Sequence, residues 1–99
     1  MTYNVLFHPE AEKELHSLNG RVKILVLKQI KKICNNPEYG DDLGNKHGFN
    51  LTGYRKMYVD NKKIRIIYKF DKNEILIKII AIGNRQELEV YKNADKRTH

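Results

Sequence analysis

The hydrophobic positions follow two different periods along the chain, and the change of period separates a helical half from a strand-rich half. After a short β-branched and aromatic run at 3–7, apolar side chains recur every three to four residues over 9–18 and 21–35. This spacing predicts a strand followed by two amphipathic helices. Pro9 suits the first position of the earlier helix, and Asn19-Gly20 suits the break between the two. The pattern therefore predicts an antiparallel two-helix hairpin.

From about residue 53 the apolar positions alternate with polar ones, which is the period of a β-strand. Segments 53–59, 63–71 and 74–82 show this alternation, and short connections rich in Asp and Asn separate them. We therefore expect a three-stranded antiparallel meander, preceded by a loop over 37–50. The last strand is apolar on both faces, which favours a buried position. Parity assigns Ile75, Ile77, Ile79 and Ala81 to one face and Leu76, Lys78, Ile80 and Ile82 to the other.

These elements predict an α+β fold in a single domain over residues 1–99. With the N-terminal strand added, we expect a four-stranded sheet whose helices cover one face and leave the other open. Strand parity assigns Lys56, Tyr58 and Arg65 to the open face. After Gly83 we expect a final turn or short helix, and then a polar tail over about 92–99.

Composition narrows the class of protein. With 40% hydrophobic residues among 99, the chain is expected to fold as an ordered domain. No apolar run approaches the roughly 18 residues that a membrane span needs, and the first residues do not resemble a secretory leader. Cys34 is the single cysteine, so we expect a reducing compartment, the cytoplasm. The four histidines are scattered without zinc-like spacing, and we expect no metal and no cofactor.

The net charge of +7 is uneven along the chain. Residues 1–50 carry 7 Lys and Arg against 6 Asp and Glu, whereas residues 51–99 carry 12 against 6. A field of this sign attracts polyanions, of which nucleic acid is the commonest, and an anionic membrane or an acidic protein segment are the alternatives. Basic composition also serves solubility, so the charge alone does not identify a partner.

The candidate chemistry lies in the basic half. The chain has no P-loop, no dinucleotide-binding glycine motif, no H-E-x-x-H motif and no motif for a serine or cysteine nucleophile. What it offers is a set of cations and phenols, Lys56, Tyr58, Arg65, Arg85 and Tyr91. Arginine grips phosphate in a bidentate manner, lysine adds a compact charge, and tyrosine stacks on a base or carries a proton. These are the requirements of RNA binding and phosphodiester cleavage.

Two motifs in this half carry a family resemblance. They are Arg-Ile-Ile-Tyr at 65–68 and Gly-Asn-Arg at 83–85 followed by Val-Tyr at 90–91. Together with the order of a strand, two helices and a meander, they resemble the RelE/ParE superfamily of bacterial toxins, and most of all its RelE branch. The resemblance covers nearly the whole chain. It implies a toxin that cuts messenger RNA in the ribosomal decoding site, with the 2′-hydroxyl as nucleophile and no metal.

The resemblance also implies roles for individual residues. Lys56 corresponds to a lysine of proton transfer and charge stabilisation, and Arg65 to the arginine that stabilises charge on the phosphate. Arg85 corresponds to a phosphate ligand and possible donor to the leaving group, and Tyr91 to the aromatic that stacks on or orients the nucleotide. The other residues that we expect to bind RNA are Tyr58, Arg55 and Lys63.

The chain departs from the family pattern at a few positions. Where RelE has a second lysine two positions after the first, this chain has Tyr58, so proton transfer is expected to be shared differently. Asn84 stands where several relatives have His or Lys. Glu87 and Glu89 are possible substitute bases, although acidic residues near a C-terminus are more often solvated.

The expected partners follow from the same resemblance. They are a cognate antitoxin, messenger RNA with 16S rRNA contacts in the decoding site, and operator DNA only through the antitoxin; no membrane is expected. An acidic amphipathic antitoxin segment would cover the basic face, with Ile67 and Ile80 as apolar flanks. Two alternatives remain open: an inhibitor of DNA gyrase of the ParE type without nuclease activity, and a basic nucleic-acid-binding module that acts as a co-repressor.

Overall fold

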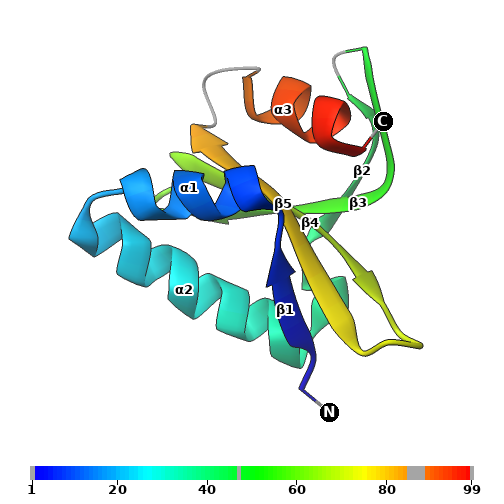
Figure 1. Ribbon diagram of the computed structural model, residues 1–99, viewed down its shortest axis with the longest axis horizontal. Coiled ribbons are helices and arrows are strands. Elements are labelled where there is room, and N and C mark those ends of the chain that lie inside the picture. The colour runs from blue at the N-terminus through cyan, green and yellow to red at the C-terminus, as the bar shows by residue number, and fades with distance from the viewer. Residues whose placement is uncertain (1, 47, 85–88, 99) are drawn as a thin grey trace.

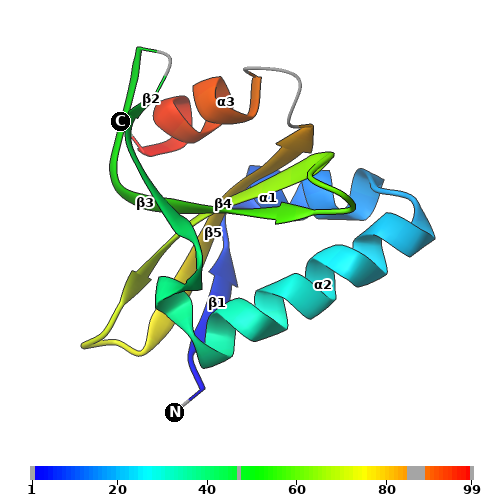
Figure 2. The ribbon, with the colours of Figure 1, turned by 180° about the vertical axis from the view of Figure 1, so that it is seen from behind.

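Five strands form one mixed sheet within residues 2–46, 48–84 and 89–98, which are the residues that the computed structural model describes. The order across the sheet is β1-β5-β4-β3-β2 (Figures 1 and 2). The predicted meander is confirmed as β3 (Phe49–Val59), β4 (Ile64–Asp71) and β5 (Leu76–Asn84), paired antiparallel. At one edge, β1 (Asn4–Phe7) pairs with β5 in parallel.

The fifth strand corrects the prediction of a four-stranded sheet. The loop expected over 37–50 contains a short 3₁₀ turn, η1 (Pro37–Tyr39), and then β2 (Asp41–Lys46), which pairs antiparallel with a β3 that begins four residues earlier than predicted. Gly48, with φ of 84°, lies in the tight turn between them. Buried Leu43 and Leu51 supply the apolar contacts that stabilise this ribbon. The α+β fold class is confirmed, with a wider sheet.

The first two helices pack on one face of the sheet. They are α1 (Pro9–Ser17) and α2 (Gly20–Asn35), and both begin at a side-chain cap: His8 accepts from the amide of Glu10, and Asn19 accepts from the amide of Val22. The two helices diverge from their joint as an open V rather than a close-packed hairpin (Figure 1). Their apolar stripes and the facing side chains of β3, β4 and β5 form the first core.

A third helix covers part of the opposite face, which corrects the expectation that helices pack on one side only. α3 (Glu89–Thr98) includes nearly all of the segment expected as a polar tail. It lies on the other side of the sheet from α1 and α2 (Figure 2) and buries Val90, Tyr91 and Ala94 in a second core. The face that carries the predicted basic residues is therefore partly covered by α3 rather than open.

A β-bulge in β5 changes the faces that parity assigned. Ile67 of β4 pairs with Ala81 while the next residue, Tyr68, pairs with Ile79, so Ile80 is an extra residue on β5. As a result Ile80 and Ala81 both belong to the second core, and Ile82 returns to the first. Strict alternation predicted the reverse, with Ala81 on the face of the first core and Ile82 on the face of the second.

Candidate functional site

Four of the predicted site residues meet where β3, β4 and α3 adjoin. Lys56 and Tyr58 are two residues apart on β3 and share a face, and Arg65 of β4 is the direct cross-strand partner of Tyr58. The Lys56 Nζ and an Nη of Arg65 donate to the Tyr58 Oη at 3.0 Å and 3.2 Å. Tyr91 reaches the group from α3. We call these four residues the cation–tyrosine cluster.

Arg65 is the buried member of the cluster. Its exposed fraction is 6%, and it is the one buried charged residue in the described chain. Its guanidinium carbon lies 4.5 Å from the ring centroid of Tyr91 and 5.0 Å from that of Tyr58, which are cation–π distances. The Nε is buried and has no hydrogen-bond partner among the described residues. The two rings therefore fix the direction of the guanidinium, and one of its terminal nitrogens points to Tyr58.

Tyr91 is 1% exposed, and one face of its ring is occupied by Arg65. The resemblance implied that this tyrosine stacks on the nucleotide. In the structure its ring packs against the Arg65 guanidinium and helps to orient it.

Tyr58 has an unusual electrostatic environment for a phenol. The hydrogen bond from Lys56 lowers the pKa of the Tyr58 hydroxyl below its ordinary value of 10.0, and the hydrogen bond from Arg65 adds to this, while partial burial opposes it. The Lys62 Nζ lies 5.8 Å from the ring centroid. Two cations thus donate to a half-buried hydroxyl and a third lies near its ring, and such a group can bind an anion or hold and release a proton.

The arrangement fits a phosphodiester better than a neutral ligand. The Lys56 ammonium supplies a point charge, and the Arg65 guanidinium supplies a fixed pair of donors, both held by contacts made before any ligand binds. Such preorganised cations stabilise negative charge that develops on phosphorus.

Other predicted residues lie elsewhere. Arg55 points to the opposite face, where its guanidinium donates to the carbonyl oxygens of Gly40 at 2.7 Å and Glu38 at 3.2 Å, so it anchors the η1 segment. Lys63 lies exposed in the turn between β3 and β4. Ile67 and Ile80, expected as apolar flanks, are buried in the second core. Arg85 and Glu87 lie outside the described residues, and of Glu89 only the helical backbone is described.

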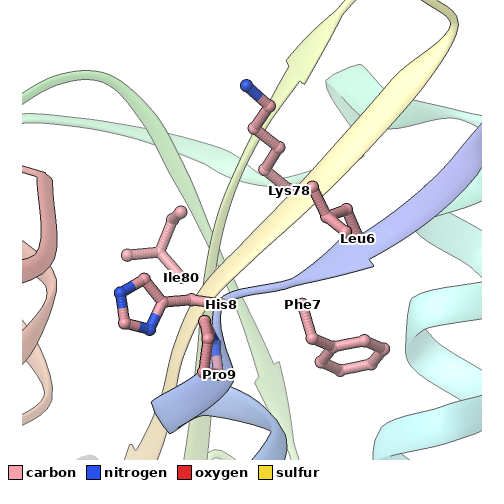
Figure 3. Close-up of a pocket in the computed structure, with 6 residues that line it drawn as sticks. All are labelled: Leu6, Phe7, His8, Pro9, Lys78 and Ile80. Atoms are coloured by element: carbon pink, nitrogen blue, oxygen red, sulfur yellow. The ribbon is translucent and has the colours of Figure 1, made fainter.

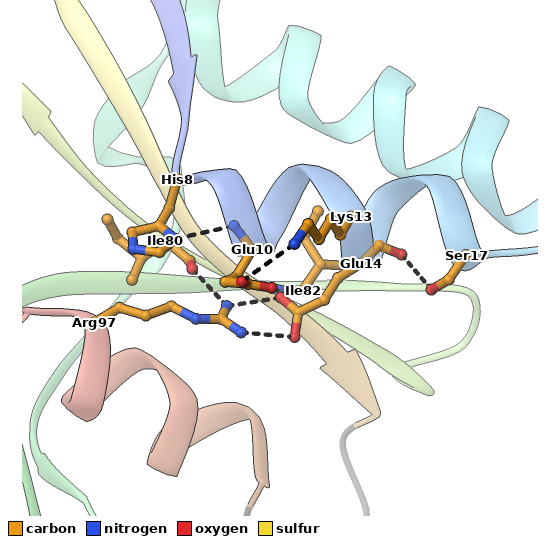
Figure 4. A network of polar contacts seen from close by, with 8 residues as sticks. All are labelled: His8, Glu10, Lys13, Glu14, Ser17, Ile80, Ile82 and Arg97. Carbon is orange, nitrogen blue, oxygen red and sulfur yellow. Dashed lines mark hydrogen bonds and ion pairs between the residues drawn. The ribbon is translucent and has the colours of Figure 1, made fainter.

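Sequence reasoning missed the contacts that hold α3 beside the cluster. The Glu14 carboxylate of α1 accepts from Arg97 of α3 at 2.8 Å and 3.2 Å and from the backbone amide of Ile82 at 3.1 Å, and Arg97 also donates to the carbonyl of Ile80 at 2.9 Å (Figure 4). The carbonyl belongs to the extra residue of the β5 bulge, and the amide lies two residues after it. Because Glu14 and Arg97 are 83 residues apart, no local pattern signals their contact.

A separate pocket of about 390 Å³ lies at the β1 edge of the sheet (Figure 3). Its lining is mainly apolar and comprises Leu6, Phe7, His8, Pro9, Lys78 and Ile80, none of which belongs to the cation–tyrosine cluster.

In the described part of the chain, no group of three or more His, Cys, Asp or Glu side chains is placed to hold a metal ion. None of the described helices has the length and hydrophobicity that crossing a bilayer requires.

Comparison with known proteins agrees on one group of relatives. The family model of the ParE toxin of the type II toxin–antitoxin system parDE matches residues 5–89. A putative RelE-like toxin protein of Escherichia coli is 27% identical over 100 residues, which cover 98% of each chain. A mutant of E. coli RelE in the free state superposes with a TM-score of 0.80 at 23% identity over 100% of both chains. A chain of a RelBE-type toxin–antitoxin complex from Mycobacterium tuberculosis gives 0.71 at 21% identity, covering 88% of this chain and 95% of that one.

Proposed function

This chain belongs to the ParE toxin family of type II toxin–antitoxin systems, in the RelE/ParE superfamily and close to RelE, and from that premise we propose that it is an endoribonuclease that cuts messenger RNA on the ribosome. A cognate antitoxin holds it inactive. The observation that supports the nuclease is the cation–tyrosine cluster, because Lys56 and Arg65 both donate hydrogen bonds to the Tyr58 hydroxyl.

The proposed reaction uses the RNA's own 2′-hydroxyl. That oxygen attacks the adjacent phosphorus, the bond to the 5′ oxygen breaks, and the products end in a 2′,3′-cyclic phosphate and a 5′-hydroxyl. The reaction needs a proton acceptor, charge neutralisation on the five-coordinate phosphorus and a proton donor. Arg65 and Lys56 supply the charge neutralisation. The excess of positive charge after residue 50 draws the protein to a ribosome rich in RNA phosphate.

Cell-free translation tests the proposed function. The purified chain is expected to cut a message that is being translated, with primer extension showing new 5′ ends within the open reading frame. The same message without ribosomes is the control and is expected to stay intact. If the translated message also remains intact, the chain is not a nuclease of this kind.

A second candidate, inhibition of DNA gyrase without nuclease activity, is favoured by the identity of the matching family model, which is that of ParE. The same fold can serve either function. A supercoiling assay with purified gyrase separates the two, because the nuclease is expected to leave supercoiling unchanged at concentrations that stop translation.

The proposed antitoxin is expected to work by covering the cluster. An acidic amphipathic segment would pair its carboxylates with Lys56, Arg65 and Arg85 and so exclude RNA phosphate. We expect the affinity of the antitoxin to fall with rising salt and on Lys56→Glu, measured by calorimetry, while Lys13→Glu on α1 serves as the control. The structure of a complex in which the cluster stays uncovered would refute occlusion as the mechanism of inhibition.

A further inference from the structure

We propose that Tyr58 is the proton acceptor for the attacking 2′-hydroxyl and that Lys56 protonates the leaving 5′ oxygen, so that the two side chains act as one pair. The inference rests on the proposed nuclease function. It names the residues that accept and donate the two protons of the reaction, which the proposed role of Arg65 in neutralising charge does not specify.

The hydrogen bonds of Tyr58 define what its oxygen can do. Two groups donate to it, the Lys56 ammonium and the Arg65 guanidinium, and neither has a lone pair to offer. The proton of the phenol therefore cannot point at either of them and has to be directed elsewhere. Loss of that proton leaves an oxygen anion that receives two charge-assisted hydrogen bonds, which favour the ionised form.

The charges that face Tyr58 all have the same sign in the described chain. Lys56 comes from its own strand, Lys62 from the following turn and Arg65 from the neighbouring strand. From α3, Tyr91 contacts Arg65 through a cation–π interaction, and from α2, Gln29 donates to the backbone carbonyl of Tyr58. The lowered pKa of the Tyr58 hydroxyl agrees with this surrounding.

The other described members of the cluster are poorer proton acceptors. The Arg65 guanidinium is a hydrogen-bond donor without an acceptor lone pair, and Tyr91 is 1% exposed against that guanidinium. Lys56 would first have to lose its own proton. Tyr58 is only partly buried, and the hydrogen bonds from Lys56 and Arg65 lower the pKa of its hydroxyl.

The proton balance closes within the pair. The 2′-hydroxyl gives its proton to the Tyr58 phenolate as the bond from the 2′ oxygen to phosphorus forms. The bond from phosphorus to the 5′ oxygen breaks with its electron pair, and that oxygen takes a proton from the Lys56 ammonium. Tyr58 is then neutral and Lys56 is an amine. Transfer of one proton across their 3.0 Å hydrogen bond restores the starting state.

One experiment on the isolated protein follows the ionisation directly. The chain has six tyrosines and no tryptophan, so tyrosinate absorbance can be titrated without interference. We expect one tyrosine to ionise below the others, and Tyr58→Phe to remove that step. Lys56→Met is expected to move the step to higher pH, and Tyr39→Phe, at an exposed tyrosine, to leave it in place. If the early step persists in Tyr58→Phe, the assignment is wrong.

A second experiment follows cleavage in cell-free translation as a function of pH. The wild-type rate is expected to rise with pH toward the pKa of Tyr58, and Tyr58→Phe is expected to lose about 10²–10⁴-fold. Tyr58→His is expected to recover part of the rate with the rising limb moved to lower pH, a result that a purely structural role for Tyr58 does not predict. Tyr39→Phe is the activity control.

The outcomes separate this inference from the proposed function. If the wild type does not cut, the nuclease proposal fails and the inference fails with it. If the wild type cuts while folded Tyr58→Phe cuts within threefold of it with the same pH profile, only the assignment of Tyr58 is overturned. Circular dichroism confirms that each variant is folded.

Discussion

Replacing Arg65 by methionine is expected to lower the rate of message cleavage by about 10²–10³-fold, which corresponds to roughly 3–4 kcal/mol of transition-state stabilisation. The guanidinium is the most rigidly held cation of the cluster, since it lies between the rings of Tyr58 and Tyr91 at 5.0 Å and 4.5 Å. Methionine keeps most of the buried volume and removes the charge. The measurement is the single-turnover rate in cell-free translation, at saturating toxin.

Arg65→Lys is expected to recover little of that rate. A lysine keeps a positive charge but loses the planar group that stacks between the two rings and the fork that meets phosphate oxygens. It also has to be desolvated at a site where the native residue is 6% exposed.

Arg55→Met provides the matched control. Arg55 lies on the adjacent strand and is half-buried, but its guanidinium holds the Gly40 and Glu38 carbonyls on the opposite face. This variant is expected to lower the free energy of unfolding and to keep the cleavage rate per folded molecule. If Arg55→Met and Arg65→Met lose the same fraction of their rate when both are folded, the placement of the reaction at the cluster is wrong.

Glu14→Ala is expected to lower the free energy of unfolding by roughly 2–4 kcal/mol, more than we expect from the loss of any exposed ion pair in this protein. The substitution leaves the Arg97 guanidinium, whose side chain is 12% exposed, without its carboxylate, and removes the acceptor of the Ile82 amide. Because α3 then loses its link to α1, Tyr91 is expected to leave Arg65 more often, and cleavage is expected to fall as well. Urea unfolding and the cleavage assay measure the two effects.

The control lies one helical turn earlier on α1. Glu10 forms an exposed ion pair with Lys13 at 3.5 Å, and Glu10→Ala is expected to change stability by less than about 0.5 kcal/mol. A double-mutant cycle of Glu14→Ala with Arg97→Met should show positive coupling, because removing both partners leaves no buried charge. Equal stability losses for Glu14→Ala and Glu10→Ala would contradict the role of Glu14 in docking α3.

The part of the site that the sequence predicted is the part that depends on strand parity. Lys56 and Tyr58 lie on the same face of β3, and Arg65 lies opposite Tyr58, because an antiparallel meander with short turns fixes this register. The same rule places Arg55, which directly precedes Lys56, on the other face. Applied consistently, parity would have excluded Arg55 from the RNA-binding set.

The parts that the sequence did not predict depend on contacts between distant segments. β2 has the composition of a loop, with two aspartates and a glycine in six residues, and is a strand because it pairs with β3. Over residues 90–98 of α3 the buried side chains are Val90, Tyr91 and Ala94, too short a stripe to stand out in a polar segment. The sequence predicted a turn or short helix after Gly83 followed by a polar tail, whereas α3 runs through that tail and packs against Arg65, so Arg65 was expected on an open face.

The parallel pairing of β1 with β5 has a consequence for the order of folding. Asn4 is paired with Leu76, so β1, at one edge of the sheet, cannot pair until β5 has been made. Contacts of such long sequence separation slow folding and close late. During synthesis, therefore, an N-terminal fragment of about three quarters of the chain has neither the finished sheet nor Tyr91. Activity is expected to appear as a late, all-or-none event, after nearly the whole polypeptide has been made.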